Sequence, residues 1–387
     1  MRRVLVRAPL LTNSGYGVHS RQLFSWLLEK SKNGLFSLTT ECLNWGNCPW
    51  YVDPNLESGL IGEIMNRSVQ IEPKYDVTFQ IQLPDEWKPE LGKYNVGVTA
   101  AVETDKCNPK WVEKCNEMDL VVVPSTFTKN VIKRSGIVTT EIKVIPEWYH
   151  KEIDDNPSGL NLRLPTEFNF LTVGLLTHNS PDLDRKNIFN TLAWFCEHFK
   201  ENKEVGLIVK TSLGKLSSFD RKQTDQYFRS IIKSVRHGEY PKIYLLHGGM
   251  TNREISALYR SESINGYVTL TRGEGYGLPI IEAAASGLPI IATNHSGHLQ
   301  FLRNGTFLPV DYKMISTPEE KNDNRIFLSG FKWAEPSKES YFTSLDELYN
   351  NYKIHKDTAE GNSEYIRENF SRESIIKIYN KVFEEVL

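Results

Sequence analysis

The chain has 387 residues, with 46 lysines and arginines against 48 aspartates and glutamates, so its formal net charge is −2. This balance gives no support for charge-driven, non-specific binding to nucleic acid, and a local basic patch stays open. The length together with 40% apolar and 24% charged residues predicts a globular protein of two domains. The longest apolar runs are only as long as strands, so we expect no transmembrane segment, while peripheral contact with a membrane stays open.

The first apolar run lies close to Met1 and resembles the start of a secretory signal. Arg7 interrupts this run, and no small-residue cleavage site follows it. We therefore interpret Arg3–Arg7 as a first buried strand.

Short apolar runs alternate with longer amphipathic stretches along nearly the whole chain. The expected strands are Arg3–Arg7, Ser37–Leu43, Val77–Leu83, Val96–Val102, Leu120–Pro124, Ile142–Ile145, Phe168–Leu176, Val205–Lys210, Ile243–Leu246, Tyr267–Leu270, Pro289–Ala292 and Phe307–Val310. Helical periodicity separates several of them, as in Val18–Leu28 and in Arg253–Arg260, where Thr251 and Glu254 form a capping box. This alternation predicts an α/β protein with parallel sheets covered on both faces.

A polar segment without apolar periodicity, 151–165, is the expected linker. We expect a Rossmann-like N-terminal domain at 1–150, a Rossmann-like C-terminal domain at 166–350, and helices at 351–387 that pack back toward the N-terminal domain. Ligands of such sheets bind at the carboxyl ends of the strands, so the two domains should face a central cleft.

The five cysteines are scattered and show no CxxC spacing: Cys42, Cys48, Cys107, Cys115 and Cys196. An odd and scattered set indicates reduced thiols, so we predict a cytoplasmic location.

The most informative stretch runs from the expected strand at 266–271 to the strand that follows Pro289. Gly273, Gly275 and Gly277 form a flexible loop, and Pro279 suits the first turn of a helix. A helix start favours phosphate, because its N–H groups are free and carry a partial positive charge. Glu274 and Glu282 flank this start, and their carboxylates accept hydrogen bonds from hydroxyl groups. The pattern predicts a ligand with phosphates in the middle and hydroxylated rings on both sides.

A second glycine pair, Gly15 and Gly17, follows the first expected strand. These glycines either approach phosphate or are small for steric reasons alone, and the full GxGxxG pattern is absent because position 20 is serine.

Basic residues follow two strands of the second half. Arg185 and Lys186 lie in a polar loop, and Lys210 ends the next strand. Such cations stabilise a diphosphate leaving group, although most single cations in loops are merely exposed. Asp182 and Asp184 spell a DxD pattern that can hold a divalent cation, but the neighbouring Arg185 and Lys186 would replace that cation, so we expect no metal.

Glu103 and Asp105 follow another apolar strand. They either bind an acceptor hydroxyl and take part in proton transfer, or belong to a helix cap formed by Thr104 or Asp105.

Taken together, these motifs resemble the retaining nucleotide-sugar glycosyltransferases with the GT-B fold, of the large family-four type. The main element is EGYGLPIIEAAASGLPIIAT, which is similar to the E-x7-E signature of that family. Further similar segments cover nearly the whole chain: GYGVHSRQL, LVVVPSTFTKNVIKRSGI, KVIPEWYH, LLHGGMTNREISALYRSES, NHSGHLQFL and WAEPS at Trp333 to Ser337.

The resemblance implies a role for each matching position. Glu274 would contact the donor sugar, Glu282 the nucleotide ribose, and Lys186 the leaving diphosphate. Gly15 and Gly17 would approach that diphosphate. Backbone N–H groups facing the sugar and phosphates would come from Gly275, Tyr276, Gly277 and Leu278. Our catalytic candidates are Glu274, Lys186, Arg185 and Glu103. Lys210 is a further candidate for binding the donor.

Two positions depart from the family pattern. The family often has an arginine after the glycine that ends the first C-domain strand, but here Leu175 follows Gly174, and Arg185 is a candidate replacement. A histidine is often found on the acceptor side of the family, and here Glu103 or Asp105 is the candidate for its place.

The resemblance therefore predicts transfer of a sugar from a UDP- or GDP-linked donor to a glycan, a lipid-linked or another hydroxyl acceptor. The anomeric configuration would be retained, and neither cofactor nor metal is expected. The alternatives are a nucleotide-sugar epimerase, a sugar phosphorylase, or a non-catalytic protein that binds a nucleotide sugar or a glycan.

Overall fold

The computed structural model describes the whole chain except residues 47, 69–73, 102, 156 and 304. The chain divides into two compact units. Unit 1 contains residues 1–148, 325–327 and 373–387, and unit 2 contains residues 149–324 and 328–372.

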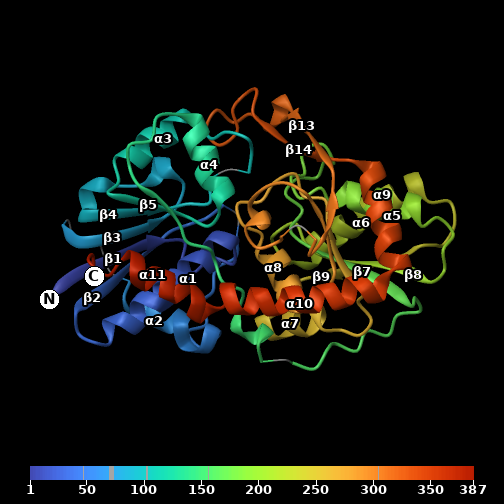
Figure 1. Ribbon diagram of the computed structural model, residues 1–387, viewed down its shortest axis with the longest axis horizontal. Coiled ribbons are helices and arrows are strands. Elements are labelled where there is room, and N and C mark those ends of the chain that lie inside the picture. The colour runs from blue at the N-terminus through green and yellow to red at the C-terminus, as the bar shows by residue number, and fades with distance from the viewer. Residues whose placement is uncertain (47, 69–73, 102, 156, 304) are drawn as a thin grey trace. The chain divides into compact units, whose positions relative to one another are not determined.

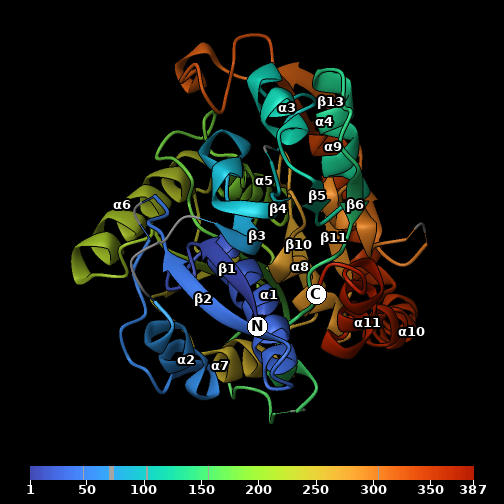
Figure 2. The ribbon, with the colours of Figure 1, turned by 90° about the vertical axis from the view of Figure 1, so that its left-hand side faces the viewer.

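Unit 1 is built on a parallel six-stranded sheet in the order β2-β1-β3-β4-β5-β6 (Figures 1 and 2). Its strands are β1 (Arg2–Ala8), β2 (Phe36–Cys42), β3 (Tyr75–Ile81), β4 (Gly92–Val98), β5 (Leu120–Val123) and β6 (Ile142–Val144). Its helices include α1 (Gly15–Ser31), α2 (Leu60–Asn66), α3 (Pro109–Asn116) and α4 (Thr126–Ser135). The interior strand β5 is buried at every position, as expected where helices cover both faces of a parallel sheet.

The last helix of the chain, α11 (Arg372–Val382), packs against α1 of unit 1. Trp26 of α1 stacks on Tyr379 with ring centroids 4.9 Å apart, and its indole N–H donates to Asn380 at 2.9 Å. Phe383 continues this contact onto Phe79 of β3, at a centroid distance of 5.1 Å. Figure 1 shows the red C-terminal helix beside the blue α1. An aromatic cluster therefore fixes the chain end to the first sheet.

Unit 2 contains a second parallel six-stranded sheet, in the order β12-β11-β10-β7-β8-β9. Its strands are β7 (Phe168–Val173), β8 (Val205–Thr211), β9 (Lys242–His247), β10 (Gly266–Thr269), β11 (Ile290–Thr293) and β12 (Leu308–Val310). Its helices include α5 (Ile188–His198), α6 (Ser218–Val235), α7 (Asn252–Tyr259), α8 (Leu278–Ala285), α9 (Lys338–Asn350) and α10 (Tyr352–Phe370). The strand order reverses between β7 and β10, which is the order of a dinucleotide-binding sheet.

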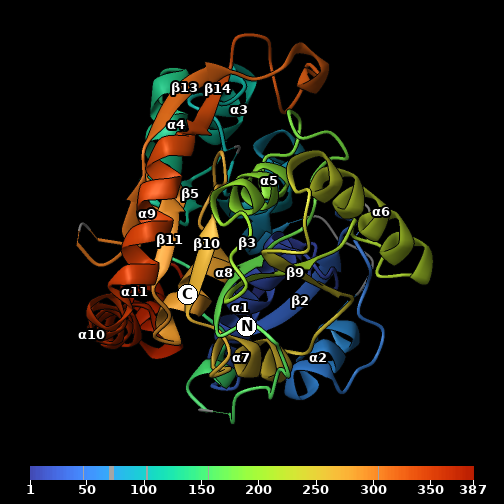
Figure 3. The same ribbon diagram turned by 90° about the vertical axis from the view of Figure 1, so that its right-hand side faces the viewer.

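The core of unit 2 lies between this sheet and its helices. Buried aromatic and aliphatic residues from β7, α5, β10 and α9 form one cluster, which includes Phe170, Phe195, Val268 and Leu345. Helix α9 lies along β11 and β12, as Figure 3 shows, and α10 packs on α8. Ser363 of α10 donates to the Ala285 carbonyl at 2.7 Å, so α10 also satisfies the carboxyl end of α8.

The predicted α/β class with two Rossmann-like parallel sheets is confirmed, and each predicted strand is present with small differences at its ends. The strand expected at Val96–Val102 is displaced toward the C-terminus, since β4 runs from Gly92 to Val98; residue 102 lies outside the described residues. Ala101 has φ 51°, which is incompatible with a strand, and the Ala100 N–H donates to the Tyr16 hydroxyl instead of to a neighbouring strand.

The prediction also missed an antiparallel hairpin in unit 2, formed by β13 (Tyr312–Ser316) and β14 (Lys332–Pro336). Its first strand is largely exposed and mixes polar with apolar residues, so it gives no buried-strand signal.

Candidate active site

The candidate active site of unit 2 lies at the carboxyl ends of β7 and β10, the neighbouring strands where the order of the sheet reverses. The chain continues from β7 into the loop 174–187 and from β10 into the loop 270–277. Ligands of open parallel sheets bind at this position, because the two loops run to opposite faces of the sheet.

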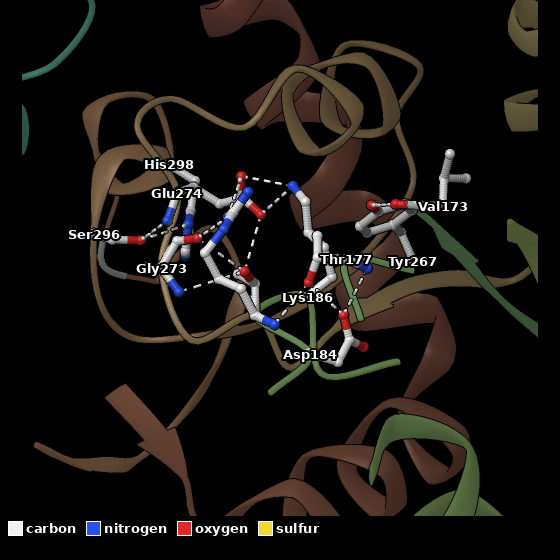
Figure 4. A network of polar contacts seen from close by, with 11 residues as sticks. Val173, Thr177, Asp184, Lys186, Tyr267, Gly273, Glu274, Ser296 and His298 are labelled. Atoms are coloured by element: carbon white, nitrogen blue, oxygen red, sulfur yellow. Dashed lines mark hydrogen bonds and ion pairs between the residues drawn. The ribbon is translucent and has the colours of Figure 1, made fainter. Parts of the chain in front are cut away.

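Lys186 and Glu274 form an ion pair that joins these two loops (Figure 4). Lys186 Nζ lies 2.6 Å from Oε1 and 2.7 Å from Oε2 of Glu274. The Thr271 hydroxyl donates a further hydrogen bond to Oε1 at 2.9 Å. The Glu274 side chain is only 8% exposed, so solvent screens this pair weakly. The sequence predicted both residues for the site but did not predict their contact.

Arg185 brings a second cation to Glu274. Its guanidinium donates to the Gly273 carbonyl and lies 3.6 Å from Glu274 Oε2. Burial alone would raise the pKa of Glu274, but the charges of Lys186 and Arg185 outweigh burial and lower this pKa to about 2. Glu274 is therefore a carboxylate at neutral pH, which accepts hydrogen bonds and does not donate them.

The backbone of Glu274 is held by the segment that follows β11. The Glu274 N–H donates to Ser296 Oγ at 2.9 Å, and the Gly297 N–H donates to the Glu274 carbonyl at 2.8 Å. A Cβ on Gly297 would lie 2.1 Å from the Gly275 carbonyl oxygen, so only glycine allows this approach. His298, fully buried beneath the loop, is bonded through Nε2 to the Thr293 carbonyl at 2.7 Å.

Arg272 holds the cation-bearing loop from the opposite side, and sequence reasoning missed it. Its guanidinium donates to the carbonyls of Pro181 at 2.8 Å and Asp184 at 2.9 Å. It also pairs with Glu335 at 2.6 Å and lies over the Trp333 ring at 5.0 Å. The side chain is 3% exposed. The sequence did offer one signal for Arg272, since this residue directly follows the expected strand at 266–271 and lies two residues before Glu274.

The DxD aspartates have different surroundings. Asp184 is fully buried, and its Oδ1 accepts from the N–H and the hydroxyl of Thr177 at 3.0 and 2.7 Å. Its Oδ2 accepts from the Ile188 N–H at 2.9 Å, which caps the start of α5. Asp182 is exposed. Asp184 thus shapes the loop that presents Lys186, and among the described residues no three acidic, histidine or cysteine side chains gather as a metal site would require.

Helix α8 starts at the glycine loop, as the sequence predicted. Gly277, with φ 105°, precedes Leu278, and no side chain caps the helix. Tyr276 is 3% exposed and packs edge-on against Phe301, at a centroid distance of 5.2 Å. Tyr276 therefore offers its backbone, and not its ring, to a ligand in front of α8. Gly275, next to it, is buried in the same loop.

Glu282 lies in the second turn of α8, with its side chain 15% exposed. The Tyr259 hydroxyl donates to Oε2 at 3.4 Å, and His150 Nε2 lies 3.9 Å from Oε1. Burial raises the pKa of Glu282, and His150 and Tyr259 oppose this rise. No role was predicted for His150 from the sequence, so its place beside Glu282 is new.

Lys210 ends β8 and donates to the Gly248 carbonyl at 2.5 Å. Burial lowers its pKa. Lys210 therefore connects β8 to the loop that follows β9, and its ammonium group is bonded to backbone and not to the Glu274 carboxylate.

In unit 1, α1 begins at the predicted glycine pair. A Cβ on Gly17 would lie 2.1 Å from the Thr12 carbonyl oxygen, whereas a Cβ on Gly15 would meet no atom within 4 Å. Packing therefore explains Gly17 but leaves Gly15 without a steric reason. Between them, Tyr16 bonds through its hydroxyl to Thr99 Oγ1 at 3.0 Å and stacks on Trp45 at 4.0 Å.

Glu103 and Asp105 lie in the loop after β4 and are partly exposed. The alternative that Thr104 or Asp105 caps the following helix is wrong, because Asn108 caps α3 by accepting from the Lys110 N–H at 3.0 Å. Burial raises the pKa of Tyr16, and the negative charge of Glu103 contributes to this rise.

Part of unit 2 is similar in sequence to known proteins. Residues 226–316, which include Glu274 and Glu282, match the family model described as Glycosyl transferases group 1. A probable sucrose-phosphate synthase of Thermosipho melanesiensis is 24% identical over 192 residues, which is 48% of this chain and 41% of that protein. The chain thus spans about two fifths of the length of the curated relative it matches.

Solved structures extend the similarity to the whole chain. A sucrose-phosphate synthase from Thermosynechococcus elongatus superimposes with a TM-score of 0.65 at 13% identity, covering 100% of this chain and 99% of that one. The E. coli trehalose-6-phosphate protein bound with UDP-2-fluoro glucose gives a TM-score of 0.62 at 11% identity, with 100% of both chains covered. This chain has the GT-B glycosyltransferase fold.

The resemblance inferred from the E-x7-E run is thereby confirmed for the fold, and for residues 226–316 also by the group 1 sequence model. In this GT-B chain the matched segment contains α8 with Glu282, the loop with Glu274, and the strand β10 before it. None of the described helices is both long and apolar enough to cross a membrane. The roles of the individual residues stay predictions.

Proposed function

We propose that this protein is a retaining glycosyltransferase that moves a sugar from a UDP- or GDP-linked donor to a hydroxyl group of a glycan or another acceptor. The observation that carries the proposal is the Lys186–Glu274 pair at the switch point of unit 2, beside the uncapped start of α8. Cation, carboxylate and helix start are the three groups that a sugar diphosphate requires.

The diphosphate of the donor would lie in front of α8, where Gly277 and Leu278 begin the helix. Negative charge grows on this diphosphate as the bond from the sugar C1 to the phosphate oxygen breaks. Lys186 and Arg185 would stabilise that charge, because preorganised cations in a poorly hydrated site act most strongly on charge that develops in the transition state. Lys210 would contribute through the loop at Gly248, to which it is bonded.

Glu274 would bind hydroxyl groups of the sugar being transferred. Because its pKa is lowered to about 2, it acts as a hydrogen-bond acceptor and not as a general acid. Donor binding would also separate Lys186 partly from Glu274, as the phosphate competes for the ammonium group. Glu282 would accept hydrogen bonds from the ribose.

The acceptor oxygen would attack C1 on the face that the diphosphate leaves. The new bond joins C1 to the acceptor oxygen, and the proton of the acceptor hydroxyl passes to the departing phosphate oxygen. This reaction would keep the anomeric configuration, and it needs no metal ion or cofactor. In unit 1, Glu103 or Asp105 would bind the acceptor, which is a glycan, a lipid-linked sugar or another hydroxyl compound. A cytoplasmic location with peripheral membrane contact fits such substrates.

Release of nucleoside diphosphate tests the proposal. The purified protein is incubated with a panel of UDP- and GDP-sugars, with and without glycan acceptors, and the product is analysed for anomeric configuration. Release that requires an acceptor supports transfer. Turnover of donor to its epimer without acceptor would point to an epimerase, and phosphate-dependent release of sugar phosphate to a phosphorylase. Donor binding without any turnover would leave only a binding protein.

Lys186→Met provides the matched control in this assay. It keeps the length of the side chain and removes the charge that stabilises the leaving group. A transferase should lose turnover in this variant, whereas a contaminating activity would not.

A further inference from the structure

His150 lies between two carboxylates of unit 2. Its Nε2 is 3.9 Å from Oε1 of Glu282, and its Nδ1 is 3.4 Å from Oε2 of Glu152. Glu282 comes from α8, whereas His150 and Glu152 belong to the segment that precedes β7. The imidazole therefore links a helix of the candidate site to a part of the chain more than a hundred residues earlier.

Both ring nitrogens of His150 are buried, and neither makes a hydrogen bond. The side chain as a whole is 12% exposed. A buried polar nitrogen without a hydrogen bond is unfavourable, so this arrangement calls for a nearby acceptor. A shift of roughly 1 Å would bring Nε2 within hydrogen-bond distance of Glu282. The ring is thus placed to engage the Glu282 carboxylate more closely.

The segment that holds His150 is fixed to α7. Ser256 donates to the Glu152 carbonyl at 2.9 Å, and Arg260 donates to the Ile153 carbonyl at 2.7 Å. These bonds secure the short 3₁₀ helix Lys151–Ile153, which begins directly after His150. The imidazole is therefore presented by a rigid backbone and not by a loose linker.

The carboxylate of Glu282 is contacted on both oxygens. The Tyr259 hydroxyl of α7 donates to Oε2 at 3.4 Å, while His150 faces Oε1. This leaves the remaining lone pairs of both oxygens for a ligand. Two neighbouring hydroxyl groups, as a ribose carries, require a carboxylate whose two oxygens are fixed in one orientation.

Other ionisable groups surround this cluster. Asp154, on the same segment as His150, adds a negative charge that raises the pKa of the imidazole. Arg367 of α10 lies 3.9 Å from Asp154 and partly balances that charge. Burial and the charge of Arg367 lower the pKa of Arg260, which follows the last residue of α7, while the charge of Asp154 opposes this. Tyr267 of β10 is buried and stays protonated, since burial and the charges of Glu274 and Glu282 raise its pKa.

We propose that His150 is a positioning residue for the donor nucleotide: its protonated ring orients the Glu282 carboxylate, and its deprotonation weakens binding of the ribose. This inference rests on the proposed function, in which Glu282 binds that ribose. His150 itself acts through Glu282 and contacts no reacting atom.

The direction of the pH effect follows from the surroundings of the ring. Burial lowers the pKa of His150, but the carboxylates of Glu282, Glu152 and Asp154 outweigh burial and raise it. The imidazolium form therefore persists below the raised pKa and is lost as the pH rises through it. Nucleotide affinity in the wild type should fall as the pH rises through the pKa of His150. In His150→Gln the affinity should not show this pH-dependent fall.

The first experiment needs no ligand. The histidine ring carbons are labelled with ¹³C, the His150 signal is assigned from its absence in His150→Gln, and its titration is followed in the wild type and in Glu282→Gln. The pKa of His150 should be lower in Glu282→Gln, because a raising charge is removed. An unchanged pKa would overturn the pairing.

The second experiment measures the affinity of UDP and of GDP by calorimetry from pH 5.5 to 8.5. In His150→Ala, the affinity for whichever nucleotide binds should fall by roughly fivefold or more at the acid end. His150→Gln should recover part of this affinity, because its amide still donates a hydrogen bond. In turnover assays the variants should raise KM with little change in kcat, since the ribose is bound equally in ground and transition states. His198→Gln is the control, because His198 of α5 pairs with Asp346 of α9 at 2.8 Å and not with Glu282.

Failure of the inference and failure of the proposed function give different results. If neither UDP nor GDP binds the wild type, the proposed function is wrong and the nucleotide role of His150 falls with it, whatever the titration shows. If nucleotide binds but wild type and His150→Gln share one affinity and one pH profile, only the positioning role is overturned.

Discussion

Removing the charge of Lys186 should destabilise unit 2 by an amount that follows from the pKa of Glu274. The ion pair and Arg185 together lower this pKa from 4.5 to about 2. Each pKa unit corresponds to about 1.36 kcal/mol, so the favourable environment of the carboxylate is worth roughly 3 kcal/mol at neutral pH. Arg185 supplies part of this amount, so it is the upper limit for Lys186→Met. Breaking a buried ion pair on one side typically has an effect of this size, because it leaves an uncompensated charge.

The pH dependence gives this prediction its sign. A carboxylate whose pKa is lowered in the folded state stabilises the protein above its unfolded pKa and loses this contribution as the pH falls toward the folded pKa. For Glu274 the stabilisation should be complete at pH 7 and fall to less than half at about pH 3. The destabilisation in Lys186→Met should shrink over the same range.

A double-mutant cycle measures the effect directly. Urea unfolding of the wild type, Lys186→Met, Glu274→Gln and the double variant is followed at pH 7 and pH 3, and the coupling energy is taken from the four midpoints. The pair Asp225–Arg229 on α6 is the control, since its side chains are 44% and 76% exposed and should show no measurable coupling. A Lys186–Glu274 coupling no larger than in this control would refute the reasoning.

Four further outcomes are expected. Glu282→Ala should weaken binding of free UDP or GDP by roughly 1–3 kcal/mol in calorimetry, and an unchanged affinity would remove the ribose role. Lys186→Ala should lower kcat more than donor affinity, by about a hundredfold or more, and equal losses in both would argue against leaving-group stabilisation. Treatment with EDTA should leave transferase activity intact; a loss that Mg²⁺ or Mn²⁺ restores would instead establish a metal site. In urea unfolding, Gly17→Ala should lower the free energy of unfolding by roughly 1–3 kcal/mol, because the added Cβ clashes with Thr12. Gly15→Ala should change the free energy of unfolding by less than about 0.5 kcal/mol.

The sequence predicted the sheets well because parallel strands are apolar on both faces and carry a strong local signal. The runs at 168–173 and 205–211 are buried almost throughout, and both were predicted as strands. The hairpin β13–β14 lacks that signal, since its first strand is largely exposed. The end of β4 was missed for a different reason. It is set by the Tyr16 hydroxyl, which takes the Ala100 N–H from a position 84 residues away.

In the candidate site, too, the sequence predicted features that lie within one segment but missed contacts between residues far apart in the chain. The glycine loop, Glu274 and the start of α8 lie within one short segment, so spacing alone predicted them. The contact of Lys186 with Glu274 joins residues 88 positions apart and depends on which strands are neighbours in the sheet. His150 ends the segment KVIPEWYH, but that segment predicted no role for it. Its contact with Glu282 joins residues 132 positions apart, and its other partner is the neighbouring Glu152.

Arg272 shows why such distant contacts matter for the chemistry. It donates to the carbonyls of Pro181 and Asp184 in the loop that carries the cations, and its own N–H donates to the Arg185 carbonyl at 2.9 Å. Arg185 in turn donates to the Gly273 carbonyl in the loop that carries Glu274. Each loop therefore sends an arginine to the backbone of the other, and under the proposed function we expect these bonds to persist when a phosphate draws Lys186 away from Glu274. If the proposed function holds, a site built in this way would keep its cations in place while charge moves onto the leaving group, which is the condition for electrostatic stabilisation of a transition state.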